Sequence, residues 1–338
     1  MVRVKEIKEG EHELLKISGI GPKAVEKLVD DGINTIAELA VKRPEEIKDV
    51  IGITLKASKD IINIAKEIAL DGVLVPVSGK IVFDLQAKQK RIPTGSIALD
   101  NALKGGFPSE AITIISGEYG SGKTQLCYQL AVNAIKMGKA VAWLETEAST
   151  FIASRIMEIA KYNNVEVDLD KDIPFVMRAV NIETPNNLFL TYEVLKKFVK
   201  EHNINLGLIV IDSFYAKFRS FYTGREQLPS RSVEEARHFG YLDRICSEMN
   251  CAVVLTNQVM DTPDVGGQRY NIMKTGTRKE ICGGNVLKHS GTYLLLVAKT
   301  KSDEWTCYIH DTPDIPSQSV TFRILPSGIK DSLGNKDQ

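Results

Sequence analysis

The chain contains the sequence Gly117-Glu118-Tyr119-Gly120-Ser121-Gly122-Lys123-Thr124, followed by Gln125. Every fixed position fits the pattern G-x-x-x-x-G-K-[S/T]. The apolar run 111–115 before it predicts a buried strand, and residues 125–131 after it predict a helix. Glycines let backbone N–H groups turn toward a phosphate chain, and the following helix N-terminus favours an anion, so the stretch predicts a phosphate-binding loop. A chance match in a glycine-rich turn is the alternative, and the flanking elements weigh against it.

Two side chains of this loop have expected roles in nucleotide binding. Lys123 is expected to reach the β- and γ-phosphates, and the Thr124 hydroxyl is expected to ligate Mg²⁺. The apolar run 206–211 predicts a further strand, which ends at Asp212. A strand that ends in aspartate is common, but after a phosphate-binding loop it has the form of the Walker B carboxylate. Asp212 is therefore the expected second residue of the metal site.

Length and composition indicate an ordinary globular protein. The 338 residues can hold a large core and two domains, and 43% of them are hydrophobic and 25% charged. No apolar run approaches the roughly 20 residues that cross a bilayer, and the N-terminus has no signal-peptide pattern. The five cysteines form no C-x-x-C pair, which is typical of reduced thiols in a cytoplasmic protein. The net charge of zero argues neither for nor against nucleic-acid binding.

Residues 1–72 predict a small all-α domain. Apolar residues at helical spacing lie on both sides of Gly19-Ile20-Gly21, and Pro22 suits the first turn of a helix. This pattern resembles a helix-hairpin-helix, in which backbone N–H groups face a DNA phosphate, with Lys23 and Lys27 on the phosphate side. A weaker second copy is expected at 51–53. The alternative is a helical hairpin used only for packing or protein contact.

Residues 73–94 predict a linker, because the helical pattern stops and Pro and Gly appear at 76 and 79. Phe83 is a large apolar residue in this mostly polar stretch. It either folds back on its own domain or contacts a neighbouring subunit.

Residues 95–338 predict an α/β domain with a mostly parallel central sheet, because short apolar strands alternate with amphipathic helices. The expected strands are 111–115, 140–144, 175–180, 206–211 and 252–256, and a helix is expected at 189–199.

Three polar side chains follow predicted strands and are candidates for the reaction. Glu147 is the expected carboxylate that polarises an attacking water, because strands of open α/β sheets deliver such groups at their carboxyl ends. Glu145 is its rival, since strand alternation would place both on one face. Gln258, after the strand 252–256, is expected to contact the γ-phosphate. For each of them a purely structural role is the alternative.

Two segments predict exposed binding loops. The first, 218–231, mixes aromatic residues with Arg219, Arg225 and Arg231, and the second, about 260–284, is polar and glycine-rich. Basic side chains on loops suit a phosphate backbone, although a solvated surface is the simpler interpretation of either loop alone. The second loop directly follows Gln258, which favours control of the loop by nucleotide. Its basic residues are Arg269, Lys274, Arg278 and Lys279.

Taken together, these motifs resemble the archaeal RadA recombinases and their eukaryotic strand-exchange relatives, within the RecA-type ATPase family. The resemblance covers nearly the whole chain and also includes Thr94-Gly95, Gly283-Gly284 and Asp311-Thr312-Pro313. It implies a RecA-like P-loop ATPase core after a helix-hairpin-helix domain. It also implies ATP-dependent filament formation on single-stranded DNA, followed by pairing and strand exchange with double-stranded DNA.

The resemblance implies further site residues and partners. Arg155 would lie near the adenine, Asp311 and Pro313 would cover ATP bound to the adjacent subunit, and Phe83 and Ala87 would contact that subunit. ATP and Mg²⁺ are the implied cofactors, with K⁺ as a further candidate. The implied partners are DNA, other copies of the chain in a filament or ring, and other recombination proteins.

Several positions depart from the family pattern. Ala87 lies one place late after Phe83, Ile152-Ala153-Ser154 replaces Arg-Pro-Glu, Asn285 replaces a histidine, and Asp314 replaces the histidine after Pro313. These departures leave a second hypothesis open, a paralogue that assists another recombinase without exchanging strands. A third class, a small-molecule kinase with a P-loop, is disfavoured by the basic loops and the N-terminal hairpins.

Overall fold

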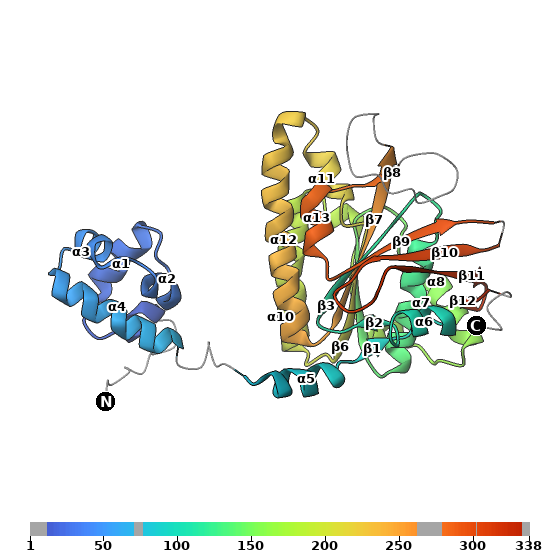
Figure 1. Cartoon of the computed structure of the whole chain (residues 1–338), viewed down its shortest axis with the longest axis horizontal. Helices are drawn as coiled ribbons and strands as arrows, with labels where there is room; N and C mark the ends of the chain where they lie inside the picture. Colours follow the sequence, from blue (N-terminus) through green and yellow to red (C-terminus); the bar gives the residue numbers. More distant parts are fainter. Residues whose placement is uncertain (1–11, 71–76, 262–278, 302, 333–338) are drawn as a thin grey trace. The chain divides into compact units, whose positions relative to one another are not determined.

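The structure of the protein, a computed structural model, describes residues 12–70, 77–261, 279–301 and 303–332 (Figure 1). Contacts between residues divide the chain into two compact units, 1–87 and 88–338. The division falls inside the segment 73–94 that the sequence predicts to be a linker.

The first unit is a set of helices around one apolar core. Gly19 has φ +95° and Gly52 has φ +75°, conformations that glycine adopts without strain, so the chain turns sharply at both places. Pro22 begins a helix directly after the first turn, and both predicted hairpins are present, although the segment before the first is only a 3₁₀ turn. The elements are η1 (Glu13–Lys16), α1 (Pro22–Asp30), α2 (Ile36–Ala40), α3 (Pro44–Ile51) and α4 (Leu55–Leu70).

A helix, α5 (Gly79–Ala87), lies where the sequence predicts a linker without helical pattern. That expectation was wrong because apolar residues at 81, 82, 83 and 85 spread around the helix and give no one-sided pattern. The helix buries no side chain within the described part of the chain, and Phe83 is 68% exposed. Phe83 therefore does not fold back on the part of its own domain that the structure describes.

Within the described residues, the second unit is built on a ten-stranded sheet with the order β12-β11-β10-β9-β3-β7-β6-β4-β5, and β8 pairs with β7 outside this order. The strands from β9 to β5 run parallel, and β10 to β12 add an antiparallel edge. The parallel strands are β3 (Ala111–Gly117), β4 (Ala140–Glu145), β5 (Phe175–Met177), β6 (Leu206–Asp212), β7 (Ala252–Asp261) and β9 (Tyr293–Lys299). The remaining strands of the sheet are β8 (Lys279–Ile281), β10 (Trp305–Asp311), β11 (Gln318–Leu325) and β12 (Gly328–Asp331).

Helices cover both faces of this sheet, as the alternation of strands and helices predicts (Figure 1). One face packs against α6 (Ile97–Ala102), α7 (Lys123–Lys136) and α8 (Ala153–Tyr162). The other packs against α10 (Pro185–Glu201), α11 (Ala216–Phe221), α12 (Leu228–Met249) and α13 (Gly284–Ser290). Strand β3 serves both cores, because Ile115 points to the first face and Ile114 to the second. The short elements are β1 (Arg91–Ile92), β2 (Phe107–Pro108), α9 (Leu169–Asp172), η2 (Ala179–Asn181) and η3 (Arg225–Gln227).

Strand register brings the predicted site residues to one edge of the sheet. Gly117 at the end of β3 is paired with Gln258 on β7, and Glu145 at the end of β4 is paired with Asp212 on β6. All four strands are parallel, so their carboxyl ends meet in the place where open α/β sheets bind ligands.

The α/β fold class is confirmed, and the predicted strands need two adjustments. The strand expected at 252–256 extends to Asp261 because β8 pairs with its end, and the strand expected at 175–180 stops at Met177. Among the described residues, we find no helix whose length and apolar character would suit it to span a membrane.

Candidate nucleotide-binding site

The glycine loop connects β3 to α7 in a conformation that requires glycine. Gly120 has φ +72° and Gly122 has φ +89°, and a Cβ atom on Gly122 would lie 2.5 Å from Ile324 Cδ1. Within the described residues, no side chain caps the N-terminus of α7, which begins at Lys123. The first N–H groups of this helix are therefore available to an anion.

The Lys123 ammonium lies inside the loop. Its Nζ donates to the carbonyl oxygens of Gly117 at 3.0 Å and Glu118 at 2.7 Å, and to Ser121 Oγ at 3.4 Å. Burial lowers the pKa of Lys123, while the negative charges of nearby carboxylates oppose that shift. The amine thus lies where the motif places the phosphate-binding lysine.

Asp212 is a buried carboxylate held by two hydroxyl groups. Thr124 Oγ1 donates to its Oδ2 at 2.7 Å, and Thr256 Oγ1 on β7 donates to its Oδ1. Burial raises the pKa of Asp212, and these two hydrogen bonds act in the opposite direction. Sequence reasoning gave Thr256 no role, although its place two residues before Gln258 on the same strand put it on the same face.

The glycine loop, Thr124 and Asp212 line a cavity of about 410 Å³, together with Glu147, Ser213 and Gln258. A hydroxyl and a carboxylate in contact, as in Thr124 and Asp212, are hard oxygen donors of the kind that Mg²⁺ takes together with phosphate oxygens. The glycine turn, the uncapped helix and the buried lysine match a polyphosphate. The residues present therefore fit both a nucleoside triphosphate and Mg²⁺.

Only one of the two candidate glutamates lines this cavity. Glu147 Oε1 accepts hydrogen bonds from Ser213 Oγ at 2.7 Å and Gln258 Nε2 at 2.9 Å. Glu145 is fully buried and accepts from Arg178 Nε at 2.5 Å and from the backbone N–H of Thr150 at 2.9 Å. The expectation that both lie on one face was wrong, because β4 ends at Glu145 and alternation does not continue beyond it.

Gln258 connects the cavity to the first basic segment. Its amide nitrogen donates to Glu147, and its Oε1 accepts from Arg219 Nη1 at 2.9 Å. The three side chains come from three elements, the turn after β4, β7 and α11. Arg219, predicted to bind DNA, thus contacts a residue that lines the cavity.

Arg155 lies on α8 and is bonded to other protein groups. Its Nε donates to Gln125 Oε1 at 2.9 Å, and its Nη atoms donate to the carbonyl oxygens of Leu325 at 2.6 Å and Pro326 at 2.8 Å. An ion pair with Glu158 adds to these contacts. Gln125 lines the cavity, so Arg155 is bonded to a residue of the cavity wall. The contact of Arg155 with adenine stays a prediction.

The segment 218–231, predicted to be an exposed binding loop, is largely helical, which corrects the expectation of a loop. It contains the end of α11, η3 and the start of α12, and Pro229 occupies the first turn of that last helix. Arg225 is exposed. Arg231 Nε lies 3.1 Å from Glu235 Oε1, and its guanidinium carbon lies 5.3 Å from the centroid of the Tyr215 ring.

The second basic segment lies mainly outside the described residues. This holds for Arg269, Lys274 and Arg278, whereas the backbone of Lys279 begins β8 and pairs with Asp261. Asp311 and Pro313 are exposed at the end of β10 and in the turn that follows it. Their expected contact with a neighbouring subunit stays a prediction.

The helix-hairpin-helix unit has a hollow of about 660 Å³ at its first hairpin. Gly21, Lys23 and Lys27 line it, together with Ile51 from the second hairpin. The two lysines predicted for the phosphate side therefore lie beside the backbone of the hairpin turn.

Comparison with known proteins agrees with this architecture. A family model described as Rad51 matches residues 86–332, and a model described as a SAM-like helix-hairpin-helix tandem matches residues 11–67. The protein named DNA repair and recombination protein RadA from Methanococcus maripaludis (strain C6) is 31% identical over 334 residues, which is 94% of this chain and 99% of that protein. The RadA proteins of Methanococcus voltae and Cenarchaeum symbiosum are 31% and 33% identical and cover 94% and 95% of this chain, over 99% and 79% of their own lengths. The RadA proteins are thus relatives of this chain over nearly its whole length, and the chain belongs to the Rad51 family.

Proposed function

We propose that this protein is an ATP-dependent recombinase of DNA repair, which assembles on single-stranded DNA and promotes pairing and strand exchange with a duplex. One observation carries the proposal. Lys123, the Thr124–Asp212 pair and Glu147 share one cavity, and Gln258 connects that cavity to Arg219 on a basic segment. The full-length similarity to proteins named for DNA repair and recombination supports it.

In this proposal the glycine loop and Lys123 bind the phosphates of ATP, and Thr124 with Asp212 holds Mg²⁺. The metal supplies charge neutralisation on the phosphate oxygens. Glu147 orients the attacking water and accepts its proton, for which Ser213 and Gln258 hold the carboxylate in place. Gln258 also contacts Arg219, so a change at the γ-phosphate reaches the segment proposed to bind DNA.

The DNA contacts proposed here come from both units. Lys23 and Lys27 at the first hairpin meet phosphates of the duplex, and exposed Arg225 meets the single strand. Exposed Phe83 on α5 contacts the adjacent subunit. All five cysteines are buried thiols, as is common in intracellular proteins, which supports such a location for this activity.

The test measures ATP hydrolysis with and without single-stranded DNA for the wild type, Lys123→Ala and Lys136→Ala. Lys136 lies exposed in the last turn of the same helix, so its substitution is the matched control. We expect DNA-stimulated hydrolysis in the wild type and the control, and loss of ATP binding or turnover in Lys123→Ala. Hydrolysis at the wild-type rate by Lys123→Ala would overturn the site.

A strand-exchange assay with the purified wild type then separates a recombinase from a paralogue that assists one. Joint molecules and exchanged strands are expected. DNA-stimulated hydrolysis without exchange would favour the assisting role, and hydrolysis that ignores DNA would favour an unrelated P-loop enzyme.

A further inference from the structure

The turn between β10 and β11 has an exposed outer side and a firmly held inner side. Asp311 and Pro313 are exposed, whereas Ile315 is buried in the core of the sheet. Thr312 Oγ1 donates to the Ile315 carbonyl oxygen at 2.7 Å and accepts from the Ile315 backbone N–H at 3.0 Å. The local shape of this turn is therefore defined by its own hydrogen bonds.

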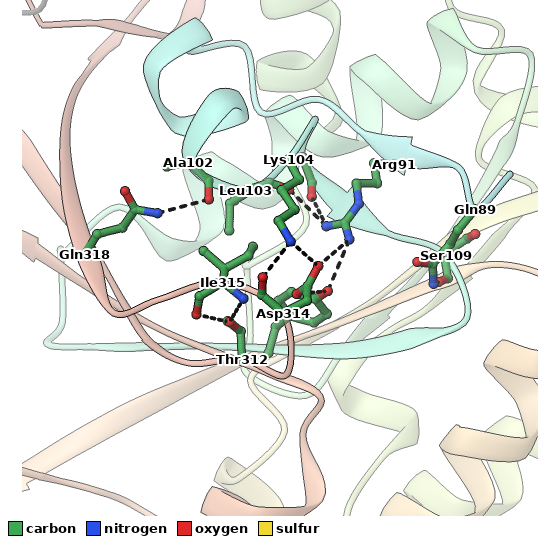
Figure 2. A network of polar contacts seen from close by, with 12 residues as sticks. Gln89, Arg91, Ala102, Leu103, Lys104, Ser109, Thr312, Asp314, Ile315 and Gln318 are labelled. Atoms are coloured by element: carbon green, nitrogen blue, oxygen red, sulfur yellow. Dashed lines mark hydrogen bonds and ion pairs between the residues drawn. The ribbon is translucent and has the colours of Figure 1, made fainter. Parts of the chain in front are cut away.

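Asp314 connects the turn to the start of the second unit. Figure 2 shows Lys104 and Arg91 pointing toward its carboxylate from neighbouring segments. Oδ2 accepts from Arg91 Nη2 at 3.2 Å and from Lys104 Nζ at 3.4 Å, and Oδ1 accepts from the Tyr293 hydroxyl at 2.7 Å. Lys104 Nζ also donates to the carbonyl oxygen of Asp314 at 2.6 Å, so both the backbone and the side chain of this residue are bound.

Arg91 is fixed independently of Asp314. Its Nη1 donates to the Leu103 carbonyl oxygen at 2.9 Å, and its guanidinium carbon lies 5.7 Å from the centroid of the Tyr293 ring. Its side chain is only 15% exposed. Asp314 therefore binds a guanidinium group that is already held in place. Because Arg91 belongs to β1, this ion pair fixes the turn relative to β1.

The charge on Asp314 is stabilised where it lies. Burial alone would raise its pKa, but hydrogen bonds from Tyr293 and Lys104, with the charges of Arg91 and Lys104, lower the pKa overall. The ion pairs accordingly persist throughout the neutral pH range.

We propose that Asp314 is a positioning residue that holds Asp311 and Pro313 in the place where they contact ATP bound to the next subunit. This inference rests on the proposed function, because it requires filament formation, and on the role that the family resemblance implies for Asp311 and Pro313 at the ATP of the adjacent subunit. Arg91 follows α5 after only three residues, 88–90. Two segments are proposed to contact other subunits, α5 and the turn between β10 and β11. Arg91 follows the first closely in the sequence and forms an ion pair with the second.

The first test compares the steady-state kinetics of DNA-stimulated ATP hydrolysis in the wild type, Asp314→Asn, Asp314→Glu and Glu201→Gln. We expect Asp314→Asn to raise the KM for ATP about fivefold with kcat within about twofold, since two partly exposed ion pairs are lost while the catalytic groups stay in place. Asp314→Glu keeps the charge, so its KM is expected to lie between those of Asp314→Asn and the wild type. Glu201→Gln removes a charge of another partly exposed pair, on α10, and leaves both constants unchanged.

The second test asks whether the effect acts on the neighbouring subunit. Asp314→Asn is mixed with excess Lys123→Ala, which lacks the ATP-binding lysine but presents a wild-type turn. In mixed filaments most Asp314→Asn subunits have such a neighbour, so their KM returns toward the wild-type value. A KM that stays high in the mixture would show an effect within the same subunit and would overturn the proposal.

The outcomes also separate this inference from the proposed function. A wild type without DNA-stimulated hydrolysis would refute the function and the inference with it. An active wild type, together with Asp314→Asn of unchanged KM, would refute the positioning role alone. If thermal unfolding shows that Asp314→Asn does not fold, Lys104→Met removes only one of the two cations. Its expected effect is a KM about twofold higher, and an unchanged KM would again refute the role.

Discussion

Two neighbouring glutamates offer a direct test of how the cavity works. The same isosteric change, Glu147→Gln or Glu145→Gln, should affect turnover at one position and stability at the other. Glu147 lines the cavity and lies within hydrogen-bond distance of Ser213 and Gln258. Removing a general base lowers turnover by about 10²–10⁴-fold, or about 3–5 kcal/mol of barrier. A glutamine at 147 can still accept from Ser213, so we expect ATP binding and unfolding to change little.

Glu145 has the opposite profile, because its carboxylate is fully buried and bound by the Arg178 guanidinium and the Thr150 backbone N–H. Weakening these bonds should lower the free energy of unfolding by about 1–3 kcal/mol, while turnover by the folded protein stays near the wild-type value. Burial alone would raise the pKa of Glu145, but Arg178 and backbone N–H groups lower it overall. Its contribution to stability is therefore fully present above the ordinary pKa of 4.5 and is lost as the pH falls through the lower folded-state pKa.

The assays are DNA-stimulated ATP hydrolysis, ATP binding and denaturant unfolding at pH 7 and at about pH 4. Each variant is the control for the other, since the substitution is the same and the positions are two residues apart. Loss of turnover in Glu145→Gln with an active Glu147→Gln would refute the assignment. If Glu147→Gln lowered the free energy of unfolding and Glu145→Gln left it unchanged, the roles described for the two carboxylates would be refuted.

Three further predictions concern the ion pair on α12, the helix α5 and the first basic segment. Burial raises the pKa of Glu235 to about 7, so between about pH 4.5 and 7 this group is protonated in the folded protein and ionised in the unfolded chain. The free energy of unfolding therefore falls as the pH rises through that window. Glu235→Gln should flatten this dependence when unfolding is measured from pH 4 to 8. Phe83→Glu should abolish the filaments that electron microscopy shows with ATP and single-stranded DNA, and the stability of the protein should be nearly unchanged. The control Asp84→Ala, on the same exposed helix, should retain the filaments. Long filaments of Phe83→Glu would count against a contact of Phe83 with the adjacent subunit. Arg225→Ala should reduce the salt dependence of binding to single-stranded DNA by about one in log–log slope. Arg231→Ala should chiefly lower the free energy of unfolding by about 1–3 kcal/mol, because it removes the guanidinium that faces the buried Glu235 carboxyl group. Equal salt slopes for wild type and Arg225→Ala would refute this distinction between the two arginines.

The phosphate loop and the strands that flank it could be predicted because the information is local. A motif of eight residues fixes the turn, and the apolar runs that end at Gly117 and Asp212 fix the strands. Parallel strands then bring their carboxyl ends together, which is why Lys123, Thr124 and Asp212 were expected in one place.

What the sequence did not reveal depends on where elements end and on contacts distant in the chain. Strand alternation suggested equal faces for Glu145 and Glu147, and only the end of β4 separates them. Helix α5 was missed because its apolar residues do not follow one face. The pair of Arg91 with Asp314 joins residues more than two hundred positions apart, which no local pattern reports.

The chain of contacts from Glu147 through Gln258 to Arg219 has a direction. A side-chain amide has one donating end and one accepting end, and here the NH₂ group faces a carboxylate while the oxygen faces a guanidinium. A half-turn of the amide would oppose oxygen to oxygen and nitrogen to nitrogen, so both bonds would break in a single movement. A rearrangement at either end of Gln258 is therefore all-or-none for the other, which suits a two-position switch better than a graded signal.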